Sequence, residues 1–124
     1  MSLAYERLDV YRYATEHLAL AMRITEGPSR PPGFLTDQYR RAALSIPLNI
    51  AEGVGKTGAE DQRRYYAIAR GSAMECGAIL DAATLLGVVD EATRQSGKDL
   101  LEHIVRMLSV LCMPRRPDRR SGHP

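Results

Sequence analysis

The chain is poor in large aromatic residues and in cysteine. Its 124 residues include no Trp, one Phe and two Cys. A core must therefore be assembled from Leu, Ile, Val, Ala and Met, and the length fits a single domain. Cys76 and Cys112 lie on separate helical segments without Cys-x-x-Cys spacing, which favours buried free thiols over a disulfide or a metal site.

Long apolar runs are also missing. No stretch approaches the ~20 apolar residues that span a bilayer. The first residues, MSLAYERLDV, lack the basic start and apolar stretch of a secretory signal. We therefore expect a cytoplasmic protein of bacterial type that does not contact a membrane.

Charge is unevenly distributed along the chain. The net charge is +2, but the last eleven residues carry +3, which leaves −1 for residues 1–113. This segment, 114–124, is rich in Pro and Arg and has no large apolar side chain, so we expect a disordered tail after a folded domain at 1–113. Its charged residues are Arg115, Arg116, Arg119, Arg120 and Asp118.

Four segments carry apolar residues at the three- and four-residue spacing of a helix. They cover about residues 9–26, 36–53, 58–86 and 90–113, and no segment alternates in the way a strand does. Short connections between the last three favour antiparallel neighbours. The sequence therefore predicts an all-α fold, an antiparallel up-and-down four-helix bundle.

One apolar stripe on each helix is assigned to the core. The predicted stripes are Tyr11, Ala14, Leu18, Ala21, Met22 and Thr25; Tyr39, Ala42, Ala43, Ile46 and Ile50; Tyr65, Ile68, Ala69, Ser72, Cys76, Ile79, Leu80 and Ala83; and Thr93, Leu100, Leu101, Ile104, Val105, Met107, Leu108 and Leu111.

Local signals refine these helices. Pro47 removes a backbone hydrogen bond inside the second helix and predicts a kink there. Thr57 and Glu60 match the capping box at the start of the third helix. Gly87 is expected to end that helix, and Asp90 to cap the fourth.

The first three helices carry a second apolar stripe on the opposite side. Such stripes usually mark an interaction surface, although isolated apolar residues on a surface are common. Because the stripes are continuous and include small residues, we expect a homo-oligomer. The predicted interface consists of Tyr13, Leu20, Ile24, Leu44, Leu48, Ala67, Gly71, Met74, Ala78 and Leu85.

No pattern typical of a catalytic, cofactor or metal site is found. Di-iron bundles need Glu-x-x-His pairs, and no Glu here is followed three residues later by His. His17 and His103 each directly follow a Glu and are expected at the surface. The GVGKTG at 53–58 lacks the first glycine of a phosphate-binding loop at the required spacing and is interpreted as a turn. We expect no enzyme activity, no metal and no cofactor.

Three stretches resemble a known family. They are LDVYRYA at 8–14, TDQYRRAALSIPLNIAEGVGK at 36–56 and ARGSAMEC at 69–76. Together they resemble the four-helix bundle family of 23S rRNA-intervening sequence proteins over roughly residues 8–112. Tyr11 stands where that family usually has Trp, and Cys76-Gly77 replaces its more usual Leu-Glu. The residues that match the family motif are Ile46, Pro47, Asn49, Glu52, Gly53, Gly71, Ser72 and Glu75.

The resemblance implies a homo-oligomer, in the form of a pentameric barrel, and no catalytic residues. Some relatives are encoded inside insertions in rRNA genes. A more distant relative, the accessory protein of diversity-generating retroelements, resembles a partner of nucleic acid and reverse transcriptase.

The polar motif residues have two interpretations. In the structural one, Asn49 or Ser45 bonds the backbone carbonyl that Pro47 leaves unpaired. Arg41 and Glu52 pair across a helix or subunit boundary, and Glu75 meets Arg40 or Arg41. In the other, the same polar strip binds a partner.

Two functions are left open. The first is an oligomeric accessory protein that binds nucleic acid, above all RNA. Arg outnumbers Lys by 15 to 2 and binds phosphate bidentately, but the −1 charge of residues 1–113 is unlike a basic domain. The alternative is a structural or protein-interaction module that binds no nucleic acid. The candidate nucleic-acid contacts are Arg40, Arg41, Arg63, Arg64, Arg70, Arg115, Arg116, Arg119 and Arg120.

Overall fold

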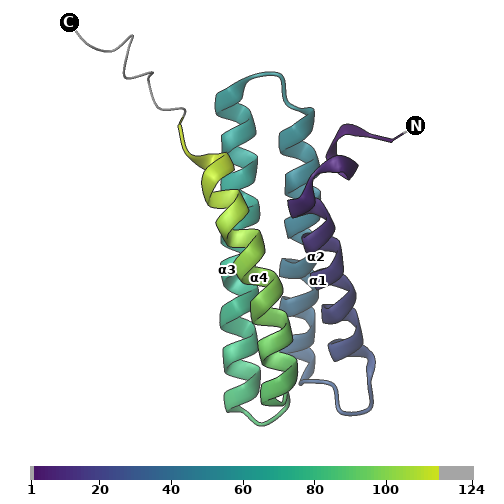
Figure 1. The fold of residues 1–124 in the computed structure, drawn as a ribbon. Coiled ribbons are helices and arrows are strands. Elements are labelled where there is room, and N and C mark those ends of the chain that lie inside the picture. The colour runs from purple at the N-terminus through teal and green to yellow at the C-terminus, as the bar shows by residue number, and fades with distance from the viewer. Residues whose placement is uncertain (1, 115–124) are drawn as a thin grey trace, which may run out of the picture.

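The chain forms an up-and-down bundle of four helices (Figure 1). The computed structural model describes residues 2–114, so all of the predicted tail except Pro114 lies outside the described residues. A short 3-10 helix, η1 (Ala4–Arg7), precedes α1 (Asp9–Glu26), α2 (Gly33–Gly55), α3 (Ala59–Leu85) and α4 (Glu91–Cys112). Residues 2–114 contain no strand. The predicted all-α four-helix bundle is therefore confirmed.

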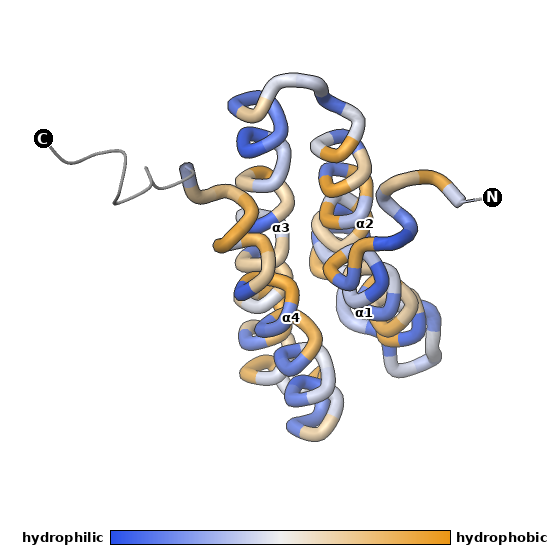
Figure 2. Tube along the Cα trace, turned by 45° about the horizontal axis from the view of Figure 1, so that its top comes forward, coloured by the Kyte–Doolittle hydropathy of each residue, from blue (hydrophilic) through white to orange (hydrophobic). Residues whose placement is uncertain are grey.

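The core lies between the four helices, each of which buries one face. On α2 the buried side chains include the whole predicted stripe from Tyr39 to Ile50. On α4 they are centred on Leu101, Ile104 and Leu108. Figure 2 shows that hydrophobic positions recur along every helix. None of the described helices combines the length and apolarity needed to cross a membrane.

The predicted stripe of α3 is wrong in its first half. Tyr66 is buried instead of Tyr65, and Ile68 is exposed. From Ala69 onward the buried positions agree with the prediction, except that Ala73 replaces Ser72. The physical cause is the neighbouring helix, because α2 makes room for the ring of Tyr66 and offers a hydroxyl partner to Ser72.

The second helix is longer than predicted and continues through its proline. It begins at Gly33, because the amides of Leu35 and Thr36 already donate to the Pro32 carbonyl at 2.9 and 3.0 Å. It passes through Pro47 as one helix and ends at Gly55. The bend expected at Pro47 stays a prediction.

The helix ends confirm two of the three predicted signals. The Asp90 carboxylate accepts a hydrogen bond from the Thr93 amide at 2.7 Å, so it caps α4. Gly87 follows α3 with φ +76°, a left-handed conformation that favours glycine. The predicted capping box is wrong, because α3 begins one residue later and its N-cap is Gly58, which has no side chain to offer.

Candidate interaction surfaces

The motif residues of α2 and α3 contact one another. The hydroxyls of Ser45 and Ser72 are 2.8 Å apart across the two helices. The Asn49 amide donates to the Ser45 hydroxyl at 2.9 Å and to the Ser45 carbonyl at 2.8 Å. We call this row of hydrogen bonds between α2 and α3 the seam. At one end of it, the Gln38 amide donates to the Glu75 carboxylate. The seam fixes how α2 and α3 lie against each other, which favours the structural interpretation of the polar motif residues.

The detailed partners differ from those predicted. Asn49 bonds to Ser45, which lies four residues before it on the same helix. Glu75 meets Gln38 and neither of the two predicted arginines. Glu52 pairs with Lys56 one turn later, at 3.5 Å.

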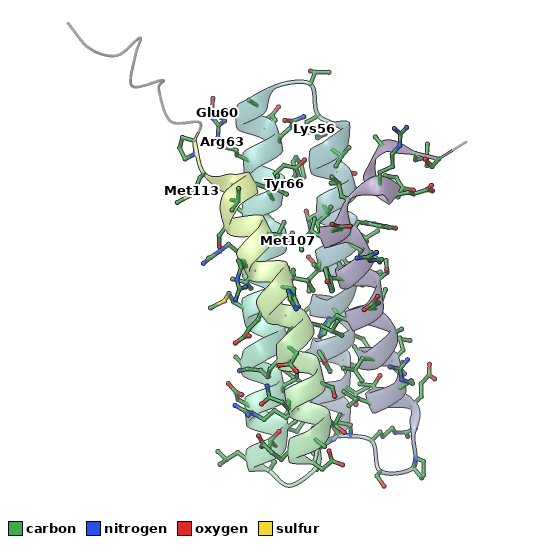
Figure 3. The ribbon with its side chains drawn as sticks, viewed as in Figure 1. Lys56, Glu60, Arg63, Tyr66, Met107 and Met113 are labelled. Atoms are coloured by element: carbon green, nitrogen blue, oxygen red, sulfur yellow. The ribbon has the colours of Figure 1, made fainter. Side chains whose placement is uncertain are left out.

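Gly53 lets α3 approach α2 closely. A Cβ atom at this position would lie 2.6 Å from Cε1 of Tyr66 and 3.2 Å from the Gln62 carbonyl oxygen. The first distance is shorter than real Cβ atoms show, and the second is tighter than most Cβ contacts. The labelled Tyr66 in Figure 3 lies on the inner side of α3, where its ring fills the space that Gly53 leaves. Ile46 and Pro47 are also buried, so these two motif residues and Gly53 belong to the core.

The outer sides of α2 and α3 expose apolar side chains. Leu44 is 46% exposed, Leu48 55% and Met74 54%. Ile68, which the sequence assigned to the core, is 43% exposed and joins them. We call this surface the outer α2–α3 face and define it by Leu44, Leu48, Ala67, Ile68, Gly71, Met74 and Ala78, all of which are exposed. Leu85, also in the predicted interface, is exposed at the last residue of α3.

The three predicted interface residues of α1 pack within the chain. The ring of Tyr13 stacks on the ring of His103 from α4, with centroids 4.8 Å apart. Leu20 lies against Gly97 of α4, since a Cβ there would be 3.6 Å from its Cδ2. Ile24 is half-buried against the core. These half-buried α1 residues contact the rest of the bundle, and their part in an oligomer interface stays a prediction.

A groove runs between α3 and α4, next to this face. It encloses about 480 Å³ and has an apolar floor that includes Ala73, Leu101 and Val105. Asp81 stands at one end, where it contacts Lys98 at 3.0 Å and Arg94 at 2.9 Å. The hydrogen bond from Lys98 and the charge of both partners hold the pKa of the Asp81 carboxyl below its usual range. Because these pairs are partly exposed, each of them adds little stability.

The candidate arginines do not form one patch. The Arg40 guanidinium donates to the Thr25 hydroxyl at 2.8 Å, and Arg70 donates to the Ser109 hydroxyl at 2.8 Å. Arg41 and Arg64 are exposed on the outer sides of α2 and α3. Arg63 is half-buried beside Glu60, at the end of the bundle that also holds Lys56 (Figure 3). The four candidate arginines of the tail lie outside the described residues.

One functional expectation is wrong: His17 is fully buried. Its relative exposure is 0%, and its Nε2 lies 3.0 Å from the hydroxyl of the buried Tyr39. Its Nδ1 has no hydrogen-bond partner within the described residues. Burial lowers the pKa of His17 from 6.5 to about 4, so the ring is neutral at pH 7. His103 is exposed, as expected.

The two cysteines are free thiols that differ in burial. Cys76 is buried, and burial raises the pKa of its thiol to about 12, which leaves it protonated at neutral pH. Cys112 is half-buried, and its thiol donates to the Leu108 carbonyl at 2.8 Å. Across residues 2–114, no three His, Cys, Asp or Glu side chains gather as a metal site would require.

Two comparisons with known proteins bear on this geometry. A family model described as 23S rRNA-intervening sequence protein matches residues 6–110. The matched range holds α1, α2 and α3 completely and nearly all of α4, together with both motif segments. A search of curated proteins finds no match.

Proposed function

Because the chain belongs to the 23S rRNA-intervening sequence protein family, we propose that it is a non-enzymatic protein that assembles with further copies of itself. The observation that carries this proposal is the outer α2–α3 face. Large apolar side chains stand exposed there on both helices, and exposed apolar surfaces of this kind usually mark interaction sites. The proposal keeps the cytoplasmic location expected from the sequence.

The small residues of the face support self-assembly. Gly71 lies in the middle of α3, and nothing lies within 4 Å of where its Cβ would be. A glycine inside a helix costs roughly 1 kcal/mol relative to alanine, so an isolated bundle gains nothing from it. A glycine does allow the backbone of another helix to approach closely. Gly71 together with its neighbours Ala67 and Ala78 suits a helix from a second copy.

A substitution on this face tests the assembly. Leu48→Glu places a charge on the outer α2–α3 face and is expected to convert the oligomer to a monomer. Each buried leucine contributes roughly 1.5–3 kcal/mol, which is more than a tenfold change in the dissociation constant. Five copies of the 13.7-kDa chain would have a mass of about 68 kDa, which light scattering distinguishes from smaller rings.

The matched control is Leu86→Glu. Leu86 is 59% exposed, close to the value for Leu48, but it lies at the turn after α3 and away from the face. It is expected to leave the oligomer intact. A wild-type chain that stays monomeric at high concentration, or a Leu86→Glu variant that dissociates equally, would count against the proposed face.

Binding of nucleic acid, above all RNA, is the second candidate function. Arg41 and Arg64 are exposed, and no carboxylate lies within 4 Å of either among the residues that the structure describes. Each copy of the chain would contribute both arginines, at separate positions along the bundle. Arginines without acidic partners are free to bind phosphate bidentately.

A salt series tests this second candidate with single-stranded RNA and a DNA of the same length. Arg64→Ala is expected to weaken RNA binding and to reduce the salt slope by roughly 0.7 for each phosphate that the variant no longer neutralises. Arg12→Ala is the control, because Arg12 already pairs with Asp9 at 3.6 Å. Absence of binding at low salt, or binding that does not change with salt, would leave the protein-interaction module as the better description.

A further inference from the structure

The buried side of α1 is made mostly of small and polar residues. Its fully buried side chains are Val10, Ala14, His17, Ala21 and Thr25. Its larger apolar residues are only partly buried. In contrast, α2 buries Tyr39, Ile46 and Ile50. Because stabilisation scales with buried apolar area, α1 is held less firmly by the hydrophobic effect than α2.

The hydrogen bonding of His17 adds a weak point at the centre of this face. Only Nε2 has a partner, the hydroxyl of Tyr39 at 3.0 Å. The orphaned Nδ1 is an acceptor or a donor without a partner, according to the tautomer. A protonated ring would carry two N–H donors and a full charge, and one of the donors would have no acceptor. Burial of such a group without compensation is costly.

No charge stands near enough to stabilise a protonated His17. Burial is the only cause that lowers its pKa, so no neighbouring carboxylate contributes. The titratable groups of the core that α2 and α3 contribute are Tyr39 and Cys76. Burial raises the pKa of both groups, so both are neutral at pH 7.

The part of α4 that faces this region of α1 runs from Gly97, which contacts Leu20, to His103, which stacks on Tyr13. Its buried members are Gly97 and Leu101, and both are uncharged. Of the ionisable residues in this part of α4, Asp99, Glu102 and His103 are exposed, whereas Lys98 is half-buried and pairs with Asp81 of α3. Glu16 of α1 is also exposed.

The other three helices have bonds that do not involve α1. The seam of Ser45, Asn49 and Ser72 joins α2 to α3. The Asp81 pairs and the bond from Arg70 to Ser109 join α3 to α4. We infer that α1 is an acid-released helix: protonation of His17 detaches α1 from the bundle while α2, α3 and α4 stay packed. Release uncovers the apolar surface that α1 covers on α2 and α4, and this inference does not depend on self-assembly.

Hydrogen exchange resolved by peptide tests the inference on the full chain. Exchange is followed between about pH 7 and pH 4.5 and corrected for the intrinsic pH dependence of the chemical step. The opening of residues 9–26 is expected to increase roughly fiftyfold over this interval, because the released histidine regains its ordinary pKa. Amides in the middle of α3 are expected to keep their protection.

Two variants sharpen the result. His17→Gln removes the titration and retains an amide for Tyr39, so exchange of α1 should lose its acid dependence. His103→Gln removes the exposed histidine that stacks on Tyr13, so it changes at most the baseline exchange of α1 and should keep the acid dependence of the wild type. Equal loss of protection in α1 and α3, or an α1 that exchanges alike at both pH values, overturns the inference. The wild-type series alone decides between these outcomes if His17→Gln does not fold.

Discussion

Lowering the pH from about 7 to about 4 is expected to reduce the free energy of unfolding by about 3 kcal/mol through His17 alone. Burial lowers the pKa of this histidine from 6.5 to about 4. Between the two values the unfolded chain binds a proton that the folded chain excludes. The contribution is therefore fully present above about pH 6.5 and is lost as the pH falls through this interval.

Urea denaturation at a series of pH values measures this effect. Carboxylates whose pKa values are lowered in the fold, such as Asp81 and Asp90, add an acid-dependent loss that all variants share. The free energy of unfolding of the wild type minus that of His17→Gln therefore isolates the contribution of the histidine. This difference is expected to decrease as the pH falls from 6.5 to 4. His103→Gln should keep the pH dependence that the wild type shows between pH 6.5 and 4. Parallel curves for wild type and His17→Gln would mean that the imidazole is solvated in the folded chain.

The positions of the four helices follow from local sequence signals. Apolar residues at helical spacing predicted α1 at its observed bounds, and Asp90 predicted the start of α4. These signals act within one or two turns of the chain, so neighbouring helices do not alter them. The start of α3 shows the limit of a local signal, because Thr57 satisfies the capping pattern and yet Gly58 occupies the N-cap.

The rotation of α3 about its axis could not be predicted from its own sequence. The segment YYAIA at 65–69 has apolar residues at adjacent positions, so a helical period fits two rotations equally well. The choice is made by α2, where Gly53 admits the ring of Tyr66. Buried alanines such as Ala69 and Ala73 mark the core side, but their small side chains give a weak pattern.

The buried histidine was missed for a related reason. His17 lies three residues after Ala14 and four before Ala21, which places all three on one helical face. That spacing was a usable signal, but the residue type argued for the surface, since histidine is seldom fully buried. The deciding contact is the hydroxyl of Tyr39, 22 residues away in the chain. The same holds for the polar motif, whose members were identifiable but whose mutual partners lie on different helices.

Replacement of Gly53 by alanine is expected to destabilise the fold by about 1–3 kcal/mol, although alanine favours helices. The added methyl group would lie 2.6 Å from the ring of Tyr66 and 3.2 Å from the backbone carbonyl of Gln62. Tyr66 is buried, and a backbone oxygen of α3 is not free to move, so the helices must separate. The loss is measured as a shift in the urea midpoint at constant slope.

Gly77→Ala is the matched control, with the opposite expected sign. Gly77 is also helical, and its added methyl group would have no neighbour closer than Nζ of Lys98 at 3.8 Å, an ordinary contact. It should therefore gain up to about 1 kcal/mol from the higher helix propensity of alanine. If both variants gained stability, the ring of Tyr66 would have to move at little cost. The close packing of α2 on α3 at Gly53 would then not be what selects the rotation of α3.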